Sequence, residues 1–463
     1  MTAGTLREEA QARGRALPSR ATITLTVACA GFFIVVLDTT VVNLALPRIG
    51  NSLGGGVSGL QWVVDGYTIV IGTLVLSAGS VSDRIGAGAA YTRGLVLFGL
   101  SSAACGVAPS LGVLLAARIV QGTGAALMLP SSLALAGHAR QDPHEQARAV
   151  ALWATAGGVA VSAGPIVGGL LTQDLGWRSV FFINVPIVAL ALAGMRAAPA
   201  IERRRSSVDL PGQIAAGLAL AGLTYGVIEG GHDGFGAAQV IVTLALGVTA
   251  AVAFLLIEAR VSRPAVPVRL LANRVALGTS GVGMATFFSI YGVIFTLSLY
   301  FQRVLHHGPA VSGLLFLPMT ILITLATLNL ATIITRCGIW VPMTIGLLLM
   351  ASSALMMLTL SDHSSSWQIG LVTLPLGVGS GFVGPCLPVG LLSAIPSEQA
   401  GVASGVANAI RQGAATIGVA AFGALFGAHV GFIVGMHRAF VVSLSALVIA
   451  IVLALTCVRQ RRA

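Results

Sequence analysis

The chain has 463 residues, of which 56% are hydrophobic and only 9% are charged, with a formal net charge of +11. A soluble protein needs roughly 25% charged residues to cover its water-facing surface, so this composition excludes an ordinary soluble enzyme or binding domain. The mean hydropathy of +0.93 and the 58 glycines are typical of helices packed together within a membrane.

The first 20 residues contain four arginines and two glutamates but no apolar run, which predicts a cytoplasmic tail without a cleavable signal peptide. Apolar runs of about 20 residues, the length of a membrane helix, then follow along the whole chain. We predict fourteen spans, at 22–46, 58–80, 91–109, 111–135, 148–172, 177–196, 210–228, 238–257, 275–301, 312–334, 340–360, 367–391, 401–428 and 438–458.

The arginines test this count, because cytoplasmic loops carry an excess of basic residues. With the N-terminus inside the cell, the inside tails and loops hold twenty arginines. The outside loops hold four, at Arg48, Arg178, Arg303 and Arg438. This split predicts fourteen helices with both termini in the cytoplasm. Because the arginines recur loop by loop and form no single patch, nucleic acid is not an expected partner.

The longest inside segments lie near 197–209 and 258–274 and bracket the seventh and eighth spans. The sequence therefore predicts an all-α polytopic membrane protein, with two six-helix bundles and two inserted helices between them. The predicted divisions are an N-terminal tail (1–20), an N-terminal bundle (21–200), a linker with helices 7 and 8 (201–260), a C-terminal bundle (261–458) and a C-terminal tail (459–463).

Four charged residues lie well inside the predicted spans, away from their ends: Asp38, Asp65, Arg118 and Arg411. A charge at the centre of a span costs about 2.5–3.5 kcal/mol on insertion scales, so each is a candidate functional residue. Burial favours the protonated form of a carboxyl group, and a nearby arginine favours the ionised form. An aspartate whose arginine contact changes between two conformations is therefore a proton switch. A fixed ion pair that only ties helices together is the alternative.

Several segments carry recognisable motifs: LDTTVVNLALP at 37–47, GSVSDRIGAG at 79–88, RIVQGTGAA at 118–126 and GGVAVSAGPIVGG at 157–169. On these motifs the sequence resembles the major facilitator superfamily. Within it, the sequence is similar to the fourteen-helix drug:proton antiporters that include bacterial antibiotic-resistance exporters. The resemblance covers about residues 20 to 458.

The resemblance implies roles for particular residues. Asp38 is the membrane acid of the first motif, which also contains Asn43, and Arg118 takes part in proton coupling with support from Gln121. Asp65 is a second candidate acid for the proton or for a cationic substrate, and Arg411 lies in a segment typical of this branch. The resemblance further implies a cytoplasmic gate at Gly79, Asp83, Arg84 and Gly86, and a glycine-rich antiporter hinge at Gly164, Pro165, Gly168 and Gly169.

Together these features predict a proton-coupled exporter of lipophilic toxic small molecules in the inner or plasma membrane, with no enzymatic activity. No Walker P-loop is present, so we expect no ATP and no other cofactor. The five cysteines and eight histidines show no metal-binding spacing. An importer of the same fold is the alternative, and a membrane-embedded transferase a more distant one. Fourteen helices can form a complete transport unit, so we expect a monomer.

Overall fold

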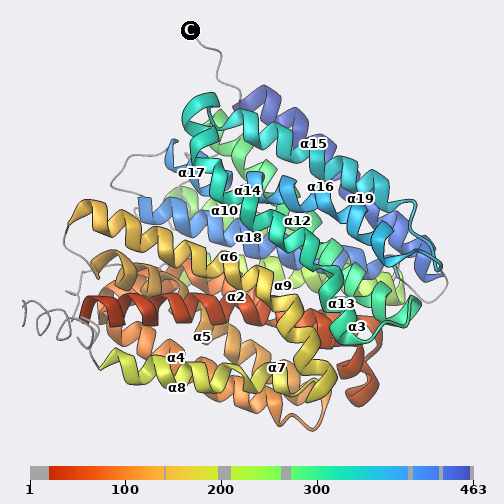
Figure 1. The fold of residues 1–463 in the computed structure, drawn as a ribbon, viewed down its shortest axis with the longest axis horizontal. Coiled ribbons are helices and arrows are strands. Elements are labelled where there is room, and N and C mark those ends of the chain that lie inside the picture. The colour runs from red at the N-terminus through yellow and green to blue at the C-terminus, as the bar shows by residue number, and fades with distance from the viewer. Residues whose placement is uncertain are drawn as a thin grey trace, which may run out of the picture.

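The computed structural model describes residues 20–139, 142–196, 210–261, 273–394, 400–426 and 431–458. Helices occupy nearly all of these residues, and no β-strand occurs among them. Residues 1–19 and 459–463 of the predicted tails lie outside the described residues, as do the predicted inside segment at 197–209 and residues 262–272 of the one at 258–274. The helices run roughly along the long axis of the molecule (Figure 1).

The first bundle contains six helical segments, the last of which is broken at Ile183. These are α2 (Arg20–Leu53), α3 (Gly56–Ile85), α4 (Ala87–Gly106), α5 (Leu111–His138), α6 (Pro143–Asp174), and α7 (Ser179–Phe182) followed by α8 (Asn184–Met195). We call the end of the molecule where α2 begins and α3 ends the proximal end, and the opposite end the distal end.

The second bundle repeats the order of the first, with short breaks and two π-helical turns (η1 and η3). Its elements are α12 (Arg274–Leu299) with η1 (Tyr300–Val304), α13 (Pro309–Leu315) with α14 (Leu317–Cys337), α15 (Trp340–Met357), α16 (Ser366–Val383) with α17 (Cys386–Leu392), α18 (Ala400–Ala424), and α19 (Phe432–Leu453) with η3 (Ala454–Val458). In the first bundle α2 packs on α6 and α4 on α5, and in the second α12 packs on α18 and α15 on α16. The equivalent pairings indicate an internal repeat, as in many membrane transporters.

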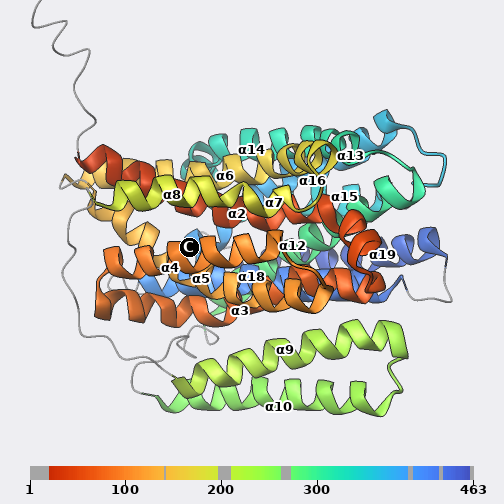
Figure 2. The ribbon, with the colours of Figure 1, turned by 90° about the horizontal axis from the view of Figure 1, so that it is seen from below.

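Two further helices, α9 (Leu210–Asp233) and α10 (Ala238–Arg260), form a hairpin between the bundles in the sequence. Figure 2 shows this hairpin as a separate layer beside the main body. Within the layer, α9 packs against α3 and α18, while α10 packs mainly on α9. Leu218, Ile241, Leu246 and Leu256 of the hairpin are exposed, which suits contact with lipid acyl chains.

In the described part of the chain, ten helices are long and apolar enough to cross a membrane, when consecutive segments such as α13 and α14 are counted as one helix. The number is eleven when the bent helix α3 is included. Each of the fourteen predicted ranges overlaps one helical segment of the described chain. The segments outside the group of eleven are α4, α18 and the broken α7–α8. The structure thus confirms an all-helical chain with ten to eleven candidate spans.

Local sequence explains where several helices begin and end. Gly86 alone separates α3 from α4, with φ at 92°, a backbone conformation that side chains with a Cβ atom rarely adopt. The Ser110 hydroxyl accepts a hydrogen bond from the Val113 amide at the start of α5. The Asn273 side chain accepts hydrogen bonds from two amides at the start of α12. Such caps satisfy the free amides of the first turn and fix the helix boundaries.

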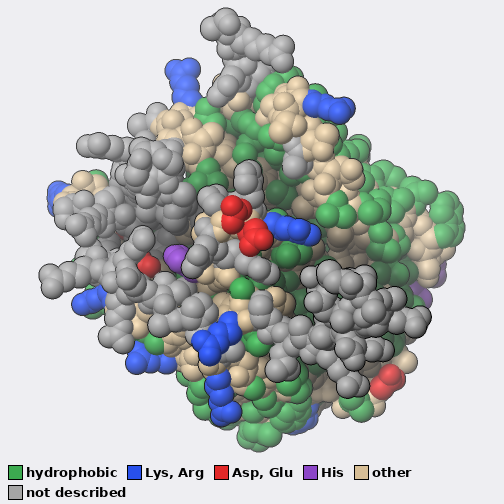
Figure 3. All heavy atoms as spheres, turned by 60° about the vertical axis from the view of Figure 1, so that its left-hand side comes forward, with side chains coloured by type: hydrophobic (Ala, Val, Ile, Leu, Met, Phe, Trp, Pro, Cys, Tyr) green, Lys and Arg blue, Asp and Glu red, His purple; other side chains and the backbone are tan. Residues whose placement is uncertain are grey.

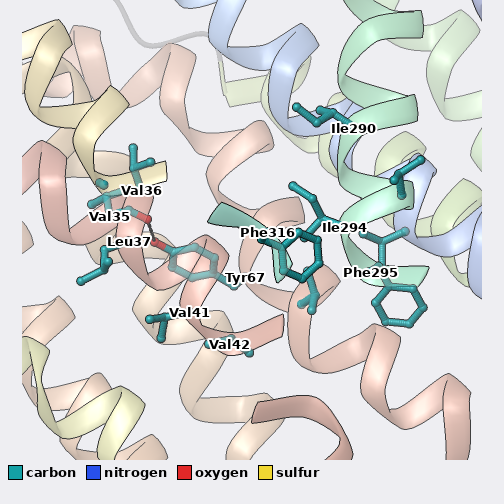
Figure 4. Close-up of a cluster of buried hydrophobic side chains, with 14 of the residues drawn as sticks. Val35, Val36, Leu37, Val41, Val42, Tyr67, Ile290, Ile294, Phe295 and Phe316 are labelled. Atoms are coloured by element: carbon teal, nitrogen blue, oxygen red, sulfur yellow. Dashed lines mark hydrogen bonds between the residues drawn. The ribbon is translucent and has the colours of Figure 1, made fainter. Parts of the chain in front are cut away.

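Buried apolar side chains join the two bundles in one hydrophobic core. In Figure 4, Tyr67 of α3 lies between the valines of α2 and the side chains of Ile294 and Phe316 from the second bundle. The Tyr67 hydroxyl donates a hydrogen bond of 3.3 Å to the Val35 carbonyl oxygen. The centre of the molecule is therefore tightly packed around α2 and α3.

Candidate functional site

The structure brings three of the predicted site residues into one buried network. Asp38 of α2 forms an ion pair with Arg118 of α5, and the side chains are 0% and 1% exposed. Gln121 lies one turn beyond Arg118, where its amide donates to Asp38 (3.0 Å) and its carbonyl oxygen accepts from Arg118 (2.8 Å). The three residues thus form a closed ring of hydrogen bonds within the bundle.

Asn184, which the sequence analysis did not single out, is a fourth member of this network. It begins α8, directly after the break in the sixth span, and its side chain is fully buried. Its amide donates to Asp38 (2.9 Å) and to the Ser102 hydroxyl (3.0 Å). An asparagine within the apolar run SVFFINVPIVALAL was the available signal, because an uncompensated amide is costly in a membrane span.

Arg118 has further partners besides Asp38. Its Nε donates to the Val63 carbonyl oxygen at 3.0 Å, and its guanidinium carbon lies 4.1 Å from the centre of the Tyr67 ring. Cation–π contact of this kind stabilises a desolvated arginine. With Asp38 ionised, the pair is neutral overall and the charges are paired. Protonation of Asp38 would remove the anion and leave the guanidinium with neutral partners only.

Asp65 lies outside this network. It is 0% exposed, and neither of its carboxylate oxygens has a hydrogen-bond partner in the described part of the chain. A buried carboxylate without a partner is strongly disfavoured, since its charge loses the solvation of water. Asp65 and Asp38 therefore have opposite surroundings, because one carboxyl group is unpartnered and the other accepts three hydrogen bonds.

Asn43 and Arg411 are also separate from the network. The Asn43 amide donates to the Thr39 carbonyl oxygen of its own helix, and its side-chain oxygen has no partner among the described residues. Arg411 of α18 donates to the Asn408 side chain at 3.0 Å, and its Nε is buried without a partner in the same part of the structure. The structure does not bring Arg411 to Asp38.

The predicted gate residues lie at the proximal end of α3. Asp83 and Arg84 are exposed in its last turn, and Gly86 follows as the link to α4. Gly79 packs toward Pro130 of α5. This is the position of a loop between the second and third spans, and the role of the segment as a gate stays a prediction.

Two glycines of the predicted hinge bring α6 against α2. A methyl group at Gly168 would lie 2.7 Å from the Val41 carbonyl oxygen, closer than real Cβ atoms come. A methyl group at Gly164 would overlap the Thr40 hydroxyl. The helix backbones approach closely here because these positions have no side chain, as is common where membrane helices pack.

The same segment also meets the second bundle. A methyl group at Gly169 would overlap the Pro309 carbonyl oxygen at the start of α13. In the reverse direction, a methyl group at Gly313 would overlap the Pro165 carbonyl oxygen. The glycine-rich segment of α6 is therefore in close contact both with α2 of its own bundle and with α13 of the second bundle.

Hydrogen bonds join the bundles along α3 and α18. The Gln61 amide donates to the carbonyl oxygens of Val419 (3.1 Å) and Ala420 (2.8 Å). The hydroxyl groups of Thr68 and Thr416 are 2.8 Å apart. These contacts lie on the first half of α3 and the second half of α18, which is the distal half of the molecule.

A second set of bonds joins α6 to α13 and α14. The Ser162 hydroxyl bonds to the Thr320 carbonyl oxygen (3.0 Å) and the Thr324 hydroxyl (2.8 Å). The Ala310 amide donates to the Gln173 side chain at 3.2 Å. These residues also belong to the distal half, so both sets hold the bundles together at the distal end.

Comparison with known proteins agrees with this architecture. The chain is 36% identical over 424 residues to the methylenomycin A resistance protein of Streptomyces coelicolor, covering 91% of this chain and 89% of the relative. It is 35% identical over 411 residues to the multidrug resistance protein Stp of Mycobacterium tuberculosis, covering 88% and 76%. Among solved structures, the xylose transporter XylE from E. coli superimposes with a TM-score of 0.67 at 15% identity, covering 96% and 100%.

The likeness to XylE shows the fold alone, because the sequences share few residues. The family comparison is stronger, since the profile of the Major Facilitator Superfamily matches residues 28–419. This match covers most of both bundles and the hairpin between them. The chain therefore belongs to the Major Facilitator Superfamily, as its motifs predicted, and is a membrane transporter and not an enzyme.

Proposed function

We propose that this transporter exports an antibiotic or a similar lipophilic toxic small molecule in exchange for protons. The observation that carries the proposal is the buried pair of Asp38 and Arg118, a titratable group held by a permanent cation. The relatives reported above are named for antibiotic and multidrug resistance, which supports export of a drug-like substrate. No cofactor is part of the proposal, because the proton gradient supplies the energy.

The proposed topology has fourteen membrane helices, with both termini in the cytoplasm. The proximal end then faces the cytoplasm, which agrees with the excess of arginine on the inside segments. Figure 3 looks toward this end and shows arginine side chains spread across it. With this topology we propose the domain divisions expected from the sequence, with bundles at 21–200 and 261–458 and a linker at 201–260.

With this orientation, the bundles are joined at the outer side of the membrane. The bonds along α3 and α18, and those between α6 and α14, would then close the path to the outside. The structure thus corresponds to an inward-facing state in the proposed cycle. Opening to the outside requires that these two sets of contacts between the bundles separate, with α6 rocking on its glycine-rich segment.

Protonation of Asp38 is the proposed coupling step. A proton that enters from the outside neutralises the carboxylate, so the pair with Arg118 weakens and the helices α2 and α5 can change their packing. Release of the proton to the cytoplasm restores the pair. The substrate and the proton compete because each favours a different packing of the same buried network.

The substrate class follows from the polar side chains that the membrane spans contain. Outside this network the buried polar side chains are mostly Ser and Thr, and many of their hydroxyls are already bonded to the backbone of their own helix. A lipophilic or amphipathic molecule therefore fits better than a polar nutrient. Import of a metabolite remains the alternative function for the fold, and direction of transport separates the two. A single protomer would contain the whole proposed pathway.

Everted membrane vesicles provide the test, because their interior acidifies and an exporter then accumulates drug inside them. The wild-type chain should take up drug in a manner that a protonophore abolishes, and Asp38→Asn should lose this uptake. The matched control is Asp362→Asn, the same chemical change at an exposed loop position. Full proton-driven uptake by Asp38→Asn would refute the coupling assignment. Proton-driven movement of the drug out of the everted vesicles would favour the importer.

A further inference from the structure

The last turn of α9 contains three side chains of the kinds that bind metal ions. Glu229, His232 and Asp233 each offer one oxygen or nitrogen atom, and these atoms all lie within 4.8 Å of one another. No other three histidine, cysteine or acidic side chains form such a group in the described part of the chain. Figure 2 shows the end of α9 at the tip of the hairpin, at the distal end of the molecule.

The local sequence brings the three side chains together. Positions 232 and 233 follow position 229 by three and four residues, so the three positions lie on one face of the helix. The helix ends directly after Asp233, because Gly234 has a φ of 90°, in the left-handed region that commonly terminates a helix. The chain then turns into α10, and the Gln239 side chain returns to contact Asp233.

Glu229 is held in place from outside the group. Its Oε1 atom accepts hydrogen bonds from the Ser58 hydroxyl (3.0 Å) and the Trp62 indole nitrogen (3.3 Å), both of α3. Both bonds use the same oxygen, which leaves Oε2 available to a ligand. Side chains that bind metal ions are commonly oriented by such outer hydrogen bonds.

His232 and Asp233 already have nearly the separation of two metal ligands. The His232 Nδ1 atom lies 2.8 Å from Asp233 Oδ1, and Asp233 Oδ2 accepts a hydrogen bond of 2.6 Å from the Gln239 amide. Neighbouring ligands at about 2.0–2.2 Å from a zinc ion are about 3.0–3.5 Å apart. The pair therefore needs to open only slightly for an ion to replace the proton that the two atoms share, and this proton passes to solvent.

The charge and the exposure of the group also suit a dication. Two carboxylates and a neutral imidazole carry two negative charges, and the carbonyl groups at the C-terminal end of a helix add partial negative charge. Among the described residues, the ion-pair partner of these acids is His232 alone. The side chains of His232 and Asp233 are 69% and 36% exposed, so an ion can enter from water.

We propose that Glu229, His232 and Asp233 bind a divalent transition-metal ion such as Zn²⁺, with water in the remaining positions. Imidazole is a good ligand for Zn²⁺, whereas Mg²⁺ and Ca²⁺ take oxygen ligands. Because Glu229 also accepts hydrogen bonds from α3, the ion connects the end of the hairpin to the first bundle. In the proposed topology this end faces the outside of the cell, so the ion comes from the extracellular medium.

The sequence alone did not indicate this site. The histidines and cysteines have no metal-binding spacing, and two of the three ligands are carboxylates. The proposal depends on the fold of the hairpin and is independent of drug export, so a failure of drug uptake in vesicles would leave it standing.

Binding is measured with ZnCl₂ alone by isothermal titration calorimetry. The full chain is purified with an affinity tag that contains no histidine and is placed in lipid nanodiscs. We expect one Zn²⁺ ion per chain, with Ca²⁺ and Mg²⁺ binding at least about tenfold more weakly. Absence of zinc binding would overturn the proposal, because the group would then be an ordinary polar helix end. Equal affinity for Ca²⁺ would overturn the assignment of the imidazole as a ligand.

Single substitutions identify the ligands. Glu229→Gln and Asp233→Asn each remove a charge at nearly constant shape, and His232→Ala removes the imidazole. Each change should weaken zinc binding by at least about tenfold, since loss of an outer partner alone costs about 10–100-fold. His363→Ala is the matched control, because His363 lies 3.7 Å from Asp362 on the exposed surface without a third ligand in the part of the chain that the structure describes. Undiminished binding in His232→Ala, or an equal loss in His363→Ala, would refute the site.

The connection to α3 is tested by thermal unfolding of the same nanodisc samples. Zinc should raise the unfolding temperature of the wild-type chain but not that of Glu229→Gln, whose side-chain oxygen can still accept the hydrogen bonds from α3. The unfolding temperature without zinc also shows whether each variant is folded. Ser58→Ala removes one of the outer donors and should weaken zinc binding by about tenfold. Wild-type zinc affinity in Ser58→Ala would refute the connection between the ion and α3.

Discussion

Replacing Asp38 by asparagine tests whether the buried network is held by charge. The substitution keeps the size of the side chain but removes the anion that faces Arg118, Gln121 and Asn184. Arg118 would remain buried with its charge, because it is 1% exposed and has no other anionic partner among the described residues. The perturbation therefore creates an unpaired buried cation.

The size of the effect follows from this geometry. Removing one partner of a buried pair destabilises a protein by about 3–5 kcal/mol. Arg118 keeps the Val63 carbonyl oxygen at 3.0 Å, the Gln121 oxygen at 2.8 Å and the Tyr67 ring, so we expect the lower end of that range, about 3 kcal/mol. Removing both charges, with Asp38→Asn and Arg118→Met together, leaves no unpaired ion and should destabilise by only about 1–2 kcal/mol.

Equilibrium unfolding of the purified chain in mixed detergent micelles measures these free energies in a double-mutant cycle. Arg118→Met alone provides the fourth corner, and Asp362→Asn serves as the exposed control, with an expected change within about 0.5 kcal/mol. If the two single changes add up in the double variant, the two charges do not stabilise each other. The structural basis of the proposed proton switch would then be wrong.

Three further outcomes follow from the packing. Gly168→Ala should impair drug uptake in vesicles, because the added methyl group would collide with the backbone of α2. The control Gly158→Ala, in the same helix, has open space around the added methyl group and should retain uptake; equal activity of the two variants would contradict the close contact. Gly86→Ala should lower the free energy of unfolding by about 1–3 kcal/mol, because a φ of 92° is strained for alanine. Gly88→Ala serves as the control in the same unfolding assay, because its added methyl group would make only ordinary contacts. Asn184→Leu should weaken proton-driven drug uptake, because Asp38 loses a hydrogen-bond donor. If uptake by this variant depended on the pH gradient as in the wild type, Asn184 would have no role in proton coupling.

Membrane embedding and the positions of the helices could be predicted from the sequence, because hydropathy is a local property of each segment. Helices overlap all fourteen predicted ranges, although only ten to eleven are long and apolar enough to count as spans by themselves. The polar residues Asn408, Arg411 and Gln412 within α18, and the break between α7 and α8, explain two of the exceptions. The motifs also predicted the superfamily, which the profile match confirms.

The partners of each buried polar group were decided only by the tertiary structure. A membrane helix is apolar on all sides, so its periodicity does not reveal which face meets which neighbour. Asp38 and Asn184 are 146 positions apart in the sequence, and no local pattern relates them. Likewise, the sequence showed Asp65 as a charge in a span, but only the tertiary packing showed that its carboxyl group is fully buried without a hydrogen-bond partner among the described residues. The physical reason is that hydropathy acts within a segment, while hydrogen bonds and ion pairs depend on how distant segments pack.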